Sequence, residues 1–410
     1  MSKSVSIVYI VVFAAIIFGF AIASAISPDK DISITENRTL SRLPAVNLEA
    51  VASRQFFEKM NQYFNDQIAL RNEMVNLYQG QMNSRLLNPD LLHSRVVSNL
   101  VVVDNKWILP MTDKVVHKNR IDESTAKLIA AVKYAEGQGT ETHFIFNPSR
   151  TKSLMHLYPA HLQTDAYAQS KAYFLSKLAN NVDVLNIGNK FDTFTDAELE
   201  QLYLETDHHW NIKGAFAAYQ EMISQLSDKS PQFEGKPLTL SDIRVTALSS
   251  GRFEGSYNVQ MNFAINPKTA DRTMIYEPKL PFAFQNFEVI GKDGSQTVKS
   301  FDDFYGFKSE RRTYAYGTIY GGDQRKIVYD NPKASNSLNV LLLKDSFMNP
   351  LTPYLAQHFR KLTVYDNRYY SEFSLKKILA SEHYDMLLIA FHDDNLFSGT
   401  YEFEKKGEGL

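Results

Sequence analysis

Residues 338–347 read LNVLLLKDSF, an apolar run that ends in three polar residues, Lys344, Asp345 and Ser346. An uninterrupted apolar run predicts a strand that is buried on both faces, as in a sheet covered by helices. A helical pattern follows at 350–358, so we expect Ser346 at a strand-to-helix turn on the carboxyl edge of the sheet. Backbone N–H groups at such a turn attract negative charge, which suits a nucleophile beside an oxyanion hole. The Gly-x-Ser-x-Gly elbow is missing, so we do not expect the α/β-hydrolase fold.

The segments on both sides of this run alternate between strand and helix patterns. Strands are predicted at 142–146, 182–187, 361–365 and 386–391, and helices at 123–136, 167–180, 191–204 in part, 212–226 and 375–381. Residues 96–103 predict one strand, with a hairpin return at 106–109. This alternation predicts an α/β sheet layered with helices.

Residues 236–335 differ from the rest of the chain. Helical periodicity fades there, and short alternating runs separated by glycines take its place. We therefore predict a β-rich insertion at 236–335 within an α/β domain made of residues 28–235 and 336–410.

The N-terminal segment predicts a membrane anchor over residues 1–27. Val5 to Ile26 is an apolar run of 22 residues, and no charge occurs between Lys3 and Asp29. A helix of this length reaches about 33 Å, enough to cross a bilayer core of about 30 Å. With Lys3 inside the cell, the rest of the chain lies outside the cytoplasm. Ala23-Ser24-Ala25 also matches a cleavage site, so a secreted form stays open.

A helical pattern follows at 56–77. The fragment Asn65–Arg71 interrupts it and predicts a kink or a break.

Composition excludes several classes of function. The 410 residues contain 44 Lys and Arg, 46 Asp and Glu and no cysteine. Without cysteine there is no disulfide framework, thiolate nucleophile or zinc knuckle. The balanced charge gives no basic field for nucleic acid, so we expect no nucleic-acid partner.

A second polar segment, Thr206 to Asn211, directly precedes a predicted helix and contains Asp207, His208, His209 and Trp210. A serine hydroxyl needs a base, and His209 can take the Ser346 proton. Asp207 can orient the imidazole and stabilise its charged form. In a locally extended backbone these two side chains face the same way and His208 points away, while Trp210 walls the site. Metal binding by Asp207, His208 and His209 is an alternative that we rank lower, because consecutive residues rarely converge on one ion.

The segment Asp207-His208-His209-Trp210 resembles the signature of the bacterial DHHW protein family. That family resembles the alginate-type O-acetyltransferases of the SGNH/GDSL superfamily, whose motif is Asp-x-His-Trp. Supporting pieces are Glu36 to Leu40, Asn65-Asp66-Gln67 with Arg71, Leu343 to Phe347 and Asp366 to Tyr370. The resemblance implies a permuted flavodoxin-like, three-layer α/β fold. It also implies a triad of Ser346 as nucleophile, His209 as base and Asp207 as its orienter.

Polar residues at other predicted strand ends are weaker candidates. Asn147 follows the strand at 142–146 and could donate to an oxyanion, while Arg150 or Lys152 could hold an acidic acceptor. Solvated loop residues are the alternative interpretation of this segment. Residues 392–395 and 368–369 follow two further strands and could line the same rim.

Three functions fit the sequence. The first is an anchored extracytoplasmic O-acyltransferase which, by the resemblance, takes an acetyl group from a membrane-bound O-acyltransferase and moves it to an envelope or secreted polysaccharide. The second is an esterase acting on the same polymers, and the third is a non-catalytic glycan-binding or scaffold protein. We predict no cofactor and no metal.

Overall fold

The computed structural model describes residues 3–30, 32–33, 38–46, 55–71, 73–74, 77, 94–97, 99–247, 252–261, 263, 265, 271, 274–279, 284–298, 300–305, 313–397 and 399–405. The chain forms two compact units. One contains residues 1–92 with 258–264, and the other contains residues 93–257 with 265–410. Each unit is described by itself. The predicted motif residues Glu36 and Asn37 lie outside the described residues.

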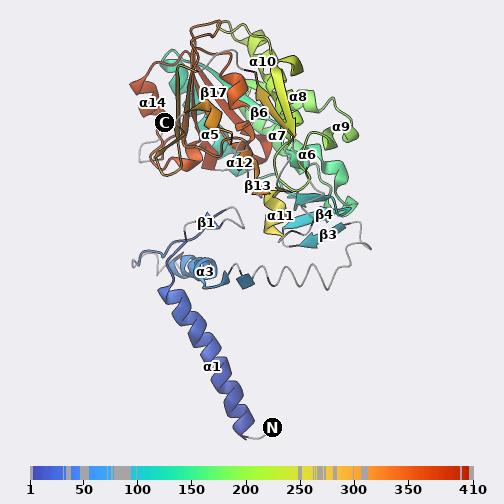
Figure 1. Ribbon diagram of the computed structural model, residues 1–410, viewed down its shortest axis with the longest axis vertical. Helices are drawn as coiled ribbons and strands as arrows, with labels where there is room; N and C mark the ends of the chain where they lie inside the picture. Colours follow the sequence, from blue (N-terminus) through green and yellow to red (C-terminus); the bar gives the residue numbers. More distant parts are fainter. Residues whose placement is uncertain are drawn as a thin grey trace. The chain divides into compact units, whose positions relative to one another are not determined.

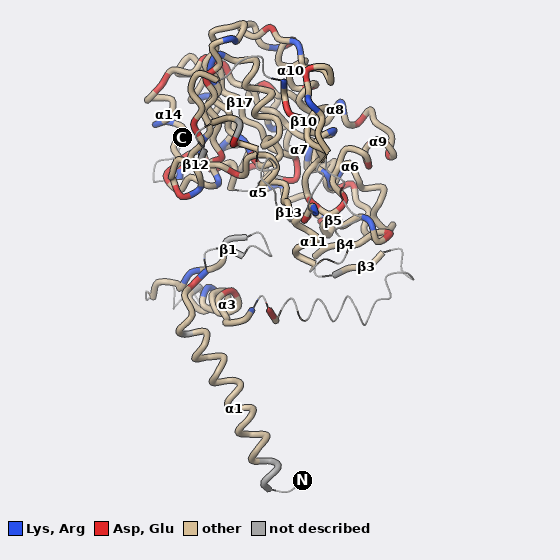
Figure 2. Tube along the Cα trace, in the orientation of Figure 1, with Lys and Arg blue, Asp and Glu red and all other residues tan. Residues whose placement is uncertain are grey.

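The N-terminal unit is built on the helix α1 (Lys3–Ile26). Its window Ile7–Ser24 has a mean hydropathy of 2.7 and no buried residue, so the helix is long and apolar enough to span a membrane. A cleaved signal sequence has the same properties. Figure 2 shows its described length without a charged residue. A second helix, α3 (Gln55–Gln67), carries Tyr63, whose hydroxyl donates to Asp29 Oδ1 over 2.9 Å. The helix ends before Leu70, which has a φ of 55°, so the predicted break is confirmed.

The second unit is centred on an eight-stranded sheet with the order β12-β11-β14-β16-β15-β17-β6-β7 (Figure 1). Its strands are β6 (Glu141–Asn147), β7 (Asp183–Asn186), β11 (Asn286–Ile290), β12 (Gln296–Val298), β14 (Lys326–Asp330), β15 (Asn339–Lys344), β16 (Lys361–Tyr365) and β17 (Met386–His392). The strands from β16 to β7 run parallel, whereas β14, β11 and β12 are antiparallel additions. The prediction of an α/β fold with a large sheet is confirmed.

Two apolar cores lie on opposite faces of this sheet. Along β15, Val340 and Leu342 belong to one core, and Leu341 and Leu343 belong to the other. Successive strand residues point to opposite faces, so a strand covered on both sides is apolar throughout. Buried side chains of α10 (Ile212–Lys229) join the first core. Those of α5 (Lys118–Gly137), α7 (Ala166–Leu178) and α14 (Leu375–Ser381) join the second.

Two local predictions need correction. Residues 96–103 do not form one strand, because a turn at Asn99 separates β3 (Ser94–Val97) from β4 (Leu100–Val103). The hairpin return to β5 (Trp107–Pro110) is as predicted. The helix expected at 350–358 shrinks to α13 (Thr352–Leu355), preceded by the 3₁₀ turn η6 (Ser346–Met348). The expected helix at 191–204 reduces to two short ones, α8 (Gly188–Phe191) and α9 (Asp196–Glu200).

The 236–335 segment has two destinations. Its strands β11, β12 and β14 extend the large sheet. Two separate pairs are formed by β8 (Ile243–Ala247) with β10 (Met274–Pro278), and by β9 (Arg252–Phe253) with β13 (Thr313–Tyr314). The short helix α12 (Tyr316–Ile319) follows β13.

Candidate active site

Ser346, His209 and Asp207 form a continuous hydrogen-bonded chain. His209 Nε2 lies 2.8 Å from Ser346 Oγ, and His209 Nδ1 lies 2.6 Å from Asp207 Oδ1. All three residues are at least nine-tenths buried. Ser346 opens the turn η6 directly after β15, and His209 precedes α10, whose first turn is capped by Asn211. Residues 137 positions apart therefore meet at the carboxyl edge of the sheet.

Asp207 is held as a carboxylate by its surroundings. Its Oδ2 accepts the backbone N–H of Ser256 over 2.7 Å, and its Oδ1 also accepts the N–H of His209. Burial alone would raise the pKa of Asp207, but the two neighbouring imidazoles and these hydrogen bonds hold it well below its usual range. Asp207 therefore stays charged beside His209.

The His209 ring is fixed between aromatic groups. The ring of Tyr316 stacks on it in parallel, with centroids 3.7 Å apart. His208 does not point away as expected, because its ring lies 3.8 Å from that of His209 and its Nδ1 bonds Ser256 Oγ over 2.8 Å. The local backbone bends at these residues, so the two histidine side chains lie side by side. Tyr316 was not identified from the sequence, which carries no pattern linking it to the Asp-x-His segment.

A second histidine–aspartate pair lies on the other side of the serine. Asp345 Oδ2 accepts from the N–H of His392 over 2.9 Å and bonds its Nδ1 over 2.7 Å. Its Oδ1 caps η6 by accepting the N–H of Phe347. The His392 ring also stacks on that of Phe347, with centroids 4.2 Å apart. The residue before Ser346 is thus tied to the end of β17, as the rim position of 392–395 suggested.

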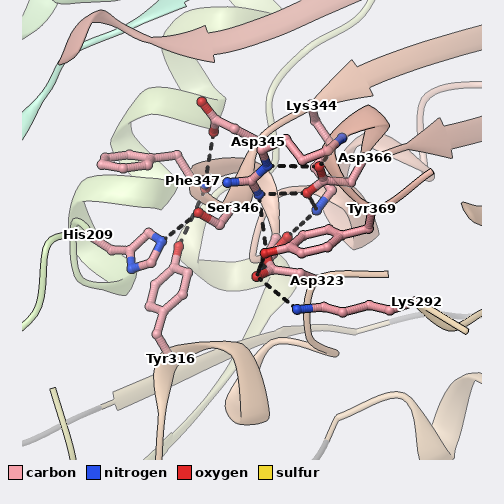
Figure 3. A network of polar contacts seen from close by, with 12 residues as sticks. His209, Lys292, Tyr316, Asp323, Lys344, Asp345, Ser346, Phe347, Asp366 and Tyr369 are labelled. Atoms are coloured by element: carbon pink, nitrogen blue, oxygen red, sulfur yellow. Dashed lines mark hydrogen bonds and ion pairs between the residues drawn. The ribbon is translucent and has the colours of Figure 1, made fainter. Parts of the chain in front are cut away.

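A buried cation lies behind the nucleophile (Figure 3). Lys344 is fully buried at the end of β15, where its Nζ donates to Asn349 Oδ1 over 2.5 Å and lies 3.3 Å from Asp366 Oδ2. Arg368 donates to both oxygens of Asp366. Asp323 joins the network through Asn349 and the Tyr369 hydroxyl. Lys344 replaces the glycine of a Gly-Asp-Ser motif, and Asp366 balances its charge.

Comparison with known proteins identifies the family. The model for DHHW proteins matches residues 160–365, half of the chain, and this range includes Asp207 to Trp210 and Ser346. The chain belongs to the DHHW protein family. Among curated proteins, none matches this sequence.

Solved structures extend the family assignment to the fold. PatB1 from Bacillus cereus has a TM-score of 0.68 over 76% of this DHHW protein and all of PatB1, at 28% identity, and at 26% in a structure with a sulfonyl adduct. A DHHW family protein from Eubacterium siraeum is 17% identical, with a TM-score of 0.59 over 76% of this chain and 96% of its own. The O-acetyltransferase domain of AlgJ from Pseudomonas putida is 14% identical, with a TM-score of 0.42 over 75% and 92% of the two chains.

The other predicted site residues of this DHHW protein are engaged in structural contacts. Arg150 is 1% exposed, and its guanidinium donates to the carbonyls of Ile108 over 2.5 Å and Glu205 over 2.8 Å, so it supports the segment before Asp207 instead of facing an acceptor. Lys152 pairs with Asp192 over 2.5 Å.

Trp210 and Asn147 lie close to the turn that carries Ser346. Trp210 is fully buried and its Nε1 donates to the Phe347 carbonyl over 3.0 Å, so it supports η6 instead of walling an open site. Asn147 is also fully buried, with its Nδ2 3.4 Å from Met348 Sδ. Among the described residues, Asn147 Oδ1 has no hydrogen-bond partner.

The metal interpretation can be tested against the same geometry. One ligand atom from each of Asp207, His208 and His209 lies within 4.8 Å of the others, close enough to hold an ion. However, both His209 nitrogens and His208 Nδ1 already have hydrogen-bond partners. A metal ion would have to break the contact between His209 and either Asp207 or Ser346. The donor set fits a proton-transfer chain better.

Proposed function

We propose that this DHHW protein is an extracytoplasmic O-acyltransferase that works through an acyl-enzyme on Ser346. The observation that carries the proposal is the Asp207–His209–Ser346 chain, with contacts of 2.6 and 2.8 Å. These distances lie within the reach that a base needs to take a proton from a nucleophile. The same contact argues against a purely scaffolding role. The sulfonyl adduct in PatB1 supports the proposal, since sulfonyl reagents form covalent adducts with activated nucleophiles.

The reaction follows from the roles of the three side chains. Ser346 Oγ attacks the acyl carbonyl carbon while His209 Nε2 takes the hydroxyl proton. The bond from that carbon to the donor oxygen then breaks, and His209 returns the proton to the leaving oxygen. A sugar hydroxyl repeats these steps on the Ser346 ester, which transfers the acyl group and restores the serine. Asp207 orients His209 and stabilises its charged form throughout.

The oxyanion of each tetrahedral intermediate needs donors. The N–H of Ser346 opens η6, and the first N–H groups of a helical turn have no partner within that turn. Asn147, at the end of β6, supplies a side-chain amide near the same turn through its contact with Met348. We assign both as oxyanion donors.

The fold and the cellular setting complete the proposal. The parallel order β16-β15-β17-β6-β7 and the chain order of the triad support the permuted flavodoxin-like, SGNH-type fold. Residues 28–235 and 336–410 form that domain, with 236–335 as its insertion and 1–27 as a membrane anchor. A membrane-bound O-acyltransferase supplies the acyl group and a polysaccharide receives it, as the motif's resemblance to alginate-type O-acetyltransferases implies.

The test uses the full chain in detergent with p-nitrophenyl acetate as the donor. Mass spectrometry should find acetyl on Ser346 in the unmodified chain and none in Ser346→Ala. An added oligosaccharide should then receive the acetyl group. Release of free acetate at the same rate with and without the acceptor would indicate an esterase. Absence of the adduct in a folded chain would reject the serine mechanism, and loss of activity on adding EDTA would revive the metal interpretation.

A further inference from the structure

A cavity of about 330 Å³ opens beside the candidate active site, at the carboxyl ends of β6 and β17. Its volume falls at the lower end of the range of about 300 to 1,000 Å³ that is usual for ligand pockets. The strand β17 is hydrogen-bonded to both β15 and β6. Because neighbouring strands lie about 4.8 Å apart, the cavity lies one or two strands from Ser346.

Two walls of the cavity adjoin the residues around the triad. Asp393 lines it and directly follows His392, which bonds Asp345. Tyr257 lines it from the other side, with its ring centroid 5.8 Å from that of His208. A molecule held in the cavity would therefore lie next to the hydrogen-bonded chain that ends at Ser346.

The carboxylates of the cavity are incompletely satisfied. Asp393 Oδ1 accepts the N–H of Ser149, and Asp394 Oδ2 accepts the hydroxyl of Thr151. The second oxygen of each is buried and, among the described residues, has no hydrogen-bond partner, although Lys171 Nζ lies 3.8 Å from Asp393 Oδ2. Burial and the charge of Asp393 raise the pKa of Asp394 to about 6. An unsatisfied buried acceptor is costly, so these oxygens favour a ligand that brings hydrogen-bond donors.

The rest of the lining defines the shape and charge of that ligand. Tyr167, Tyr257 and Phe397 supply aromatic surface. A third carboxylate, Asp113, also lines the cavity and pairs with His117 over 2.6 Å. Three carboxylates face one histidine, so the lining repels anions. Aromatic rings together with acceptor oxygens suit the apolar faces and the hydroxyls of a sugar ring.

We propose that this cavity binds the acceptor of the transferase, and that the acceptor unit is a neutral or amino sugar and not a uronic acid. The inference rests on the proposed function for the word acceptor, and on the cavity alone for its sugar chemistry. It also replaces the sequence-based expectation that Arg150 or Lys152 holds an acidic acceptor, because both cations are already paired.

The test measures binding separately from catalysis. The full chain in detergent is titrated by calorimetry with chitotetraose, with its de-N-acetylated form and with tetragalacturonate. We expect the first two to bind at least about 10-fold more tightly than the uronate, a difference of about 1.4 kcal/mol. Asp394→Asn should weaken their binding about 10-fold. The matched control is Asp192→Asn, an exposed carboxylate outside the cavity, which should change nothing.

A second variant protects the test from misfolding. Tyr167→Leu removes an aromatic wall but keeps the carboxylates, and it should also weaken the binding of both glucosamine oligomers. Equal or tighter binding of tetragalacturonate would overturn the inference, as would unchanged binding in both folded variants. Because none of these measurements needs an acyl-enzyme, they separate failure of the inference from failure of the proposed function. Absence of Ser346 acetylation would reject the latter alone.

Discussion

The backbone N–H of Ser256 donates to Oδ2 of Asp207 over 2.7 Å. Ser256 lies in the 236–335 segment, whereas Asp207 precedes α10. The chain between His209 and Ser346 thus returns to hold the carboxylate that orients the histidine. This approach depends on Gly255, since a Cβ there would lie 2.2 Å from the Thr206 carbonyl oxygen.

Replacing Gly255 with alanine should disturb the site. The added methyl group would push residue 255 away from Thr206 and lengthen the bond from Ser256 to Asp207. We expect acylation of Ser346 to slow by about 10- to 100-fold and the free energy of unfolding to fall by about 1–3 kcal/mol. Burst kinetics with p-nitrophenyl acetate and urea unfolding measure the two effects. Gly399→Ala is the matched control, because a Cβ at position 399 meets no atom within 4 Å. Identical behaviour of the two variants would contradict the close approach.

Asp207→Asn should separate orientation of the base from its presence. The amide keeps the size of the side chain but loses the charge that stabilises the protonated imidazole. In a serine triad such a change costs about 10⁴-fold in rate, as the handling of His tautomers by the carboxylate explains. We expect a loss of about 10³- to 10⁴-fold in the acylation rate of this chain, measured by stopped-flow release of p-nitrophenol. Asp192→Asn, remote from the triad, should retain the full rate, and a loss below 10-fold in Asp207→Asn would argue against the assigned role.

The sequence was informative where chemistry follows from local pattern. The apolar run before Ser346 and the Asp-x-His spacing located the three residues that meet in the structure, because strand ends and their loops gather at one sheet edge. The partners of Lys344 and His392 could not be found this way, since Asp366 and Asp345 reach them through the fold. Arg150 was misjudged for a related reason. A cation in a loop is usually solvated, but this one is covered by neighbouring chain segments and bonded to their carbonyls.

His392→Gln should destabilise the protein in a pH-dependent way. Burial lowers the pKa of His392, but the charge and hydrogen bond of Asp345 outweigh it and raise the pKa above its ordinary 6.5. The stabilisation is therefore complete below pH 6.5 and is lost as the pH rises through the raised value. Burial raises the pKa of Asp345, but His392 lowers it to about 2, so the contribution of Asp345 is complete above pH 3.8 and is lost as the pH falls towards 2. Asp393 and Asp394 also favour the charged form of His392.

The variant should thus cost about 2 kcal/mol at pH 5, as expected for a hydrogen bond between charged groups. At pH 9 the cost should be smaller, because His392 is then closer to neutral in both states. Urea unfolding of the wild type and the variant at the two pH values gives the difference. The same cost at both pH values would show that His392 acts as a neutral hydrogen-bond donor and not as a cation.

Lys344→Met should test whether the buried cation is needed to compensate Asp366. Methionine has a similar length and fits an apolar core, but it leaves a fully buried carboxylate with Arg368 as its remaining cation in this network. Removing one partner of a buried ion pair costs about 3–5 kcal/mol, and the bonds from Arg368 should bring the loss towards the lower end. Lys152→Met is the matched control, since that lysine forms a partly exposed pair with Asp192 and should cost no more than about 1 kcal/mol. The double variant Lys344→Met with Asp366→Asn should recover part of the lost stability, because no uncompensated charge remains. Equal unfolding midpoints for the two single variants would show that Asp366 does not depend on Lys344.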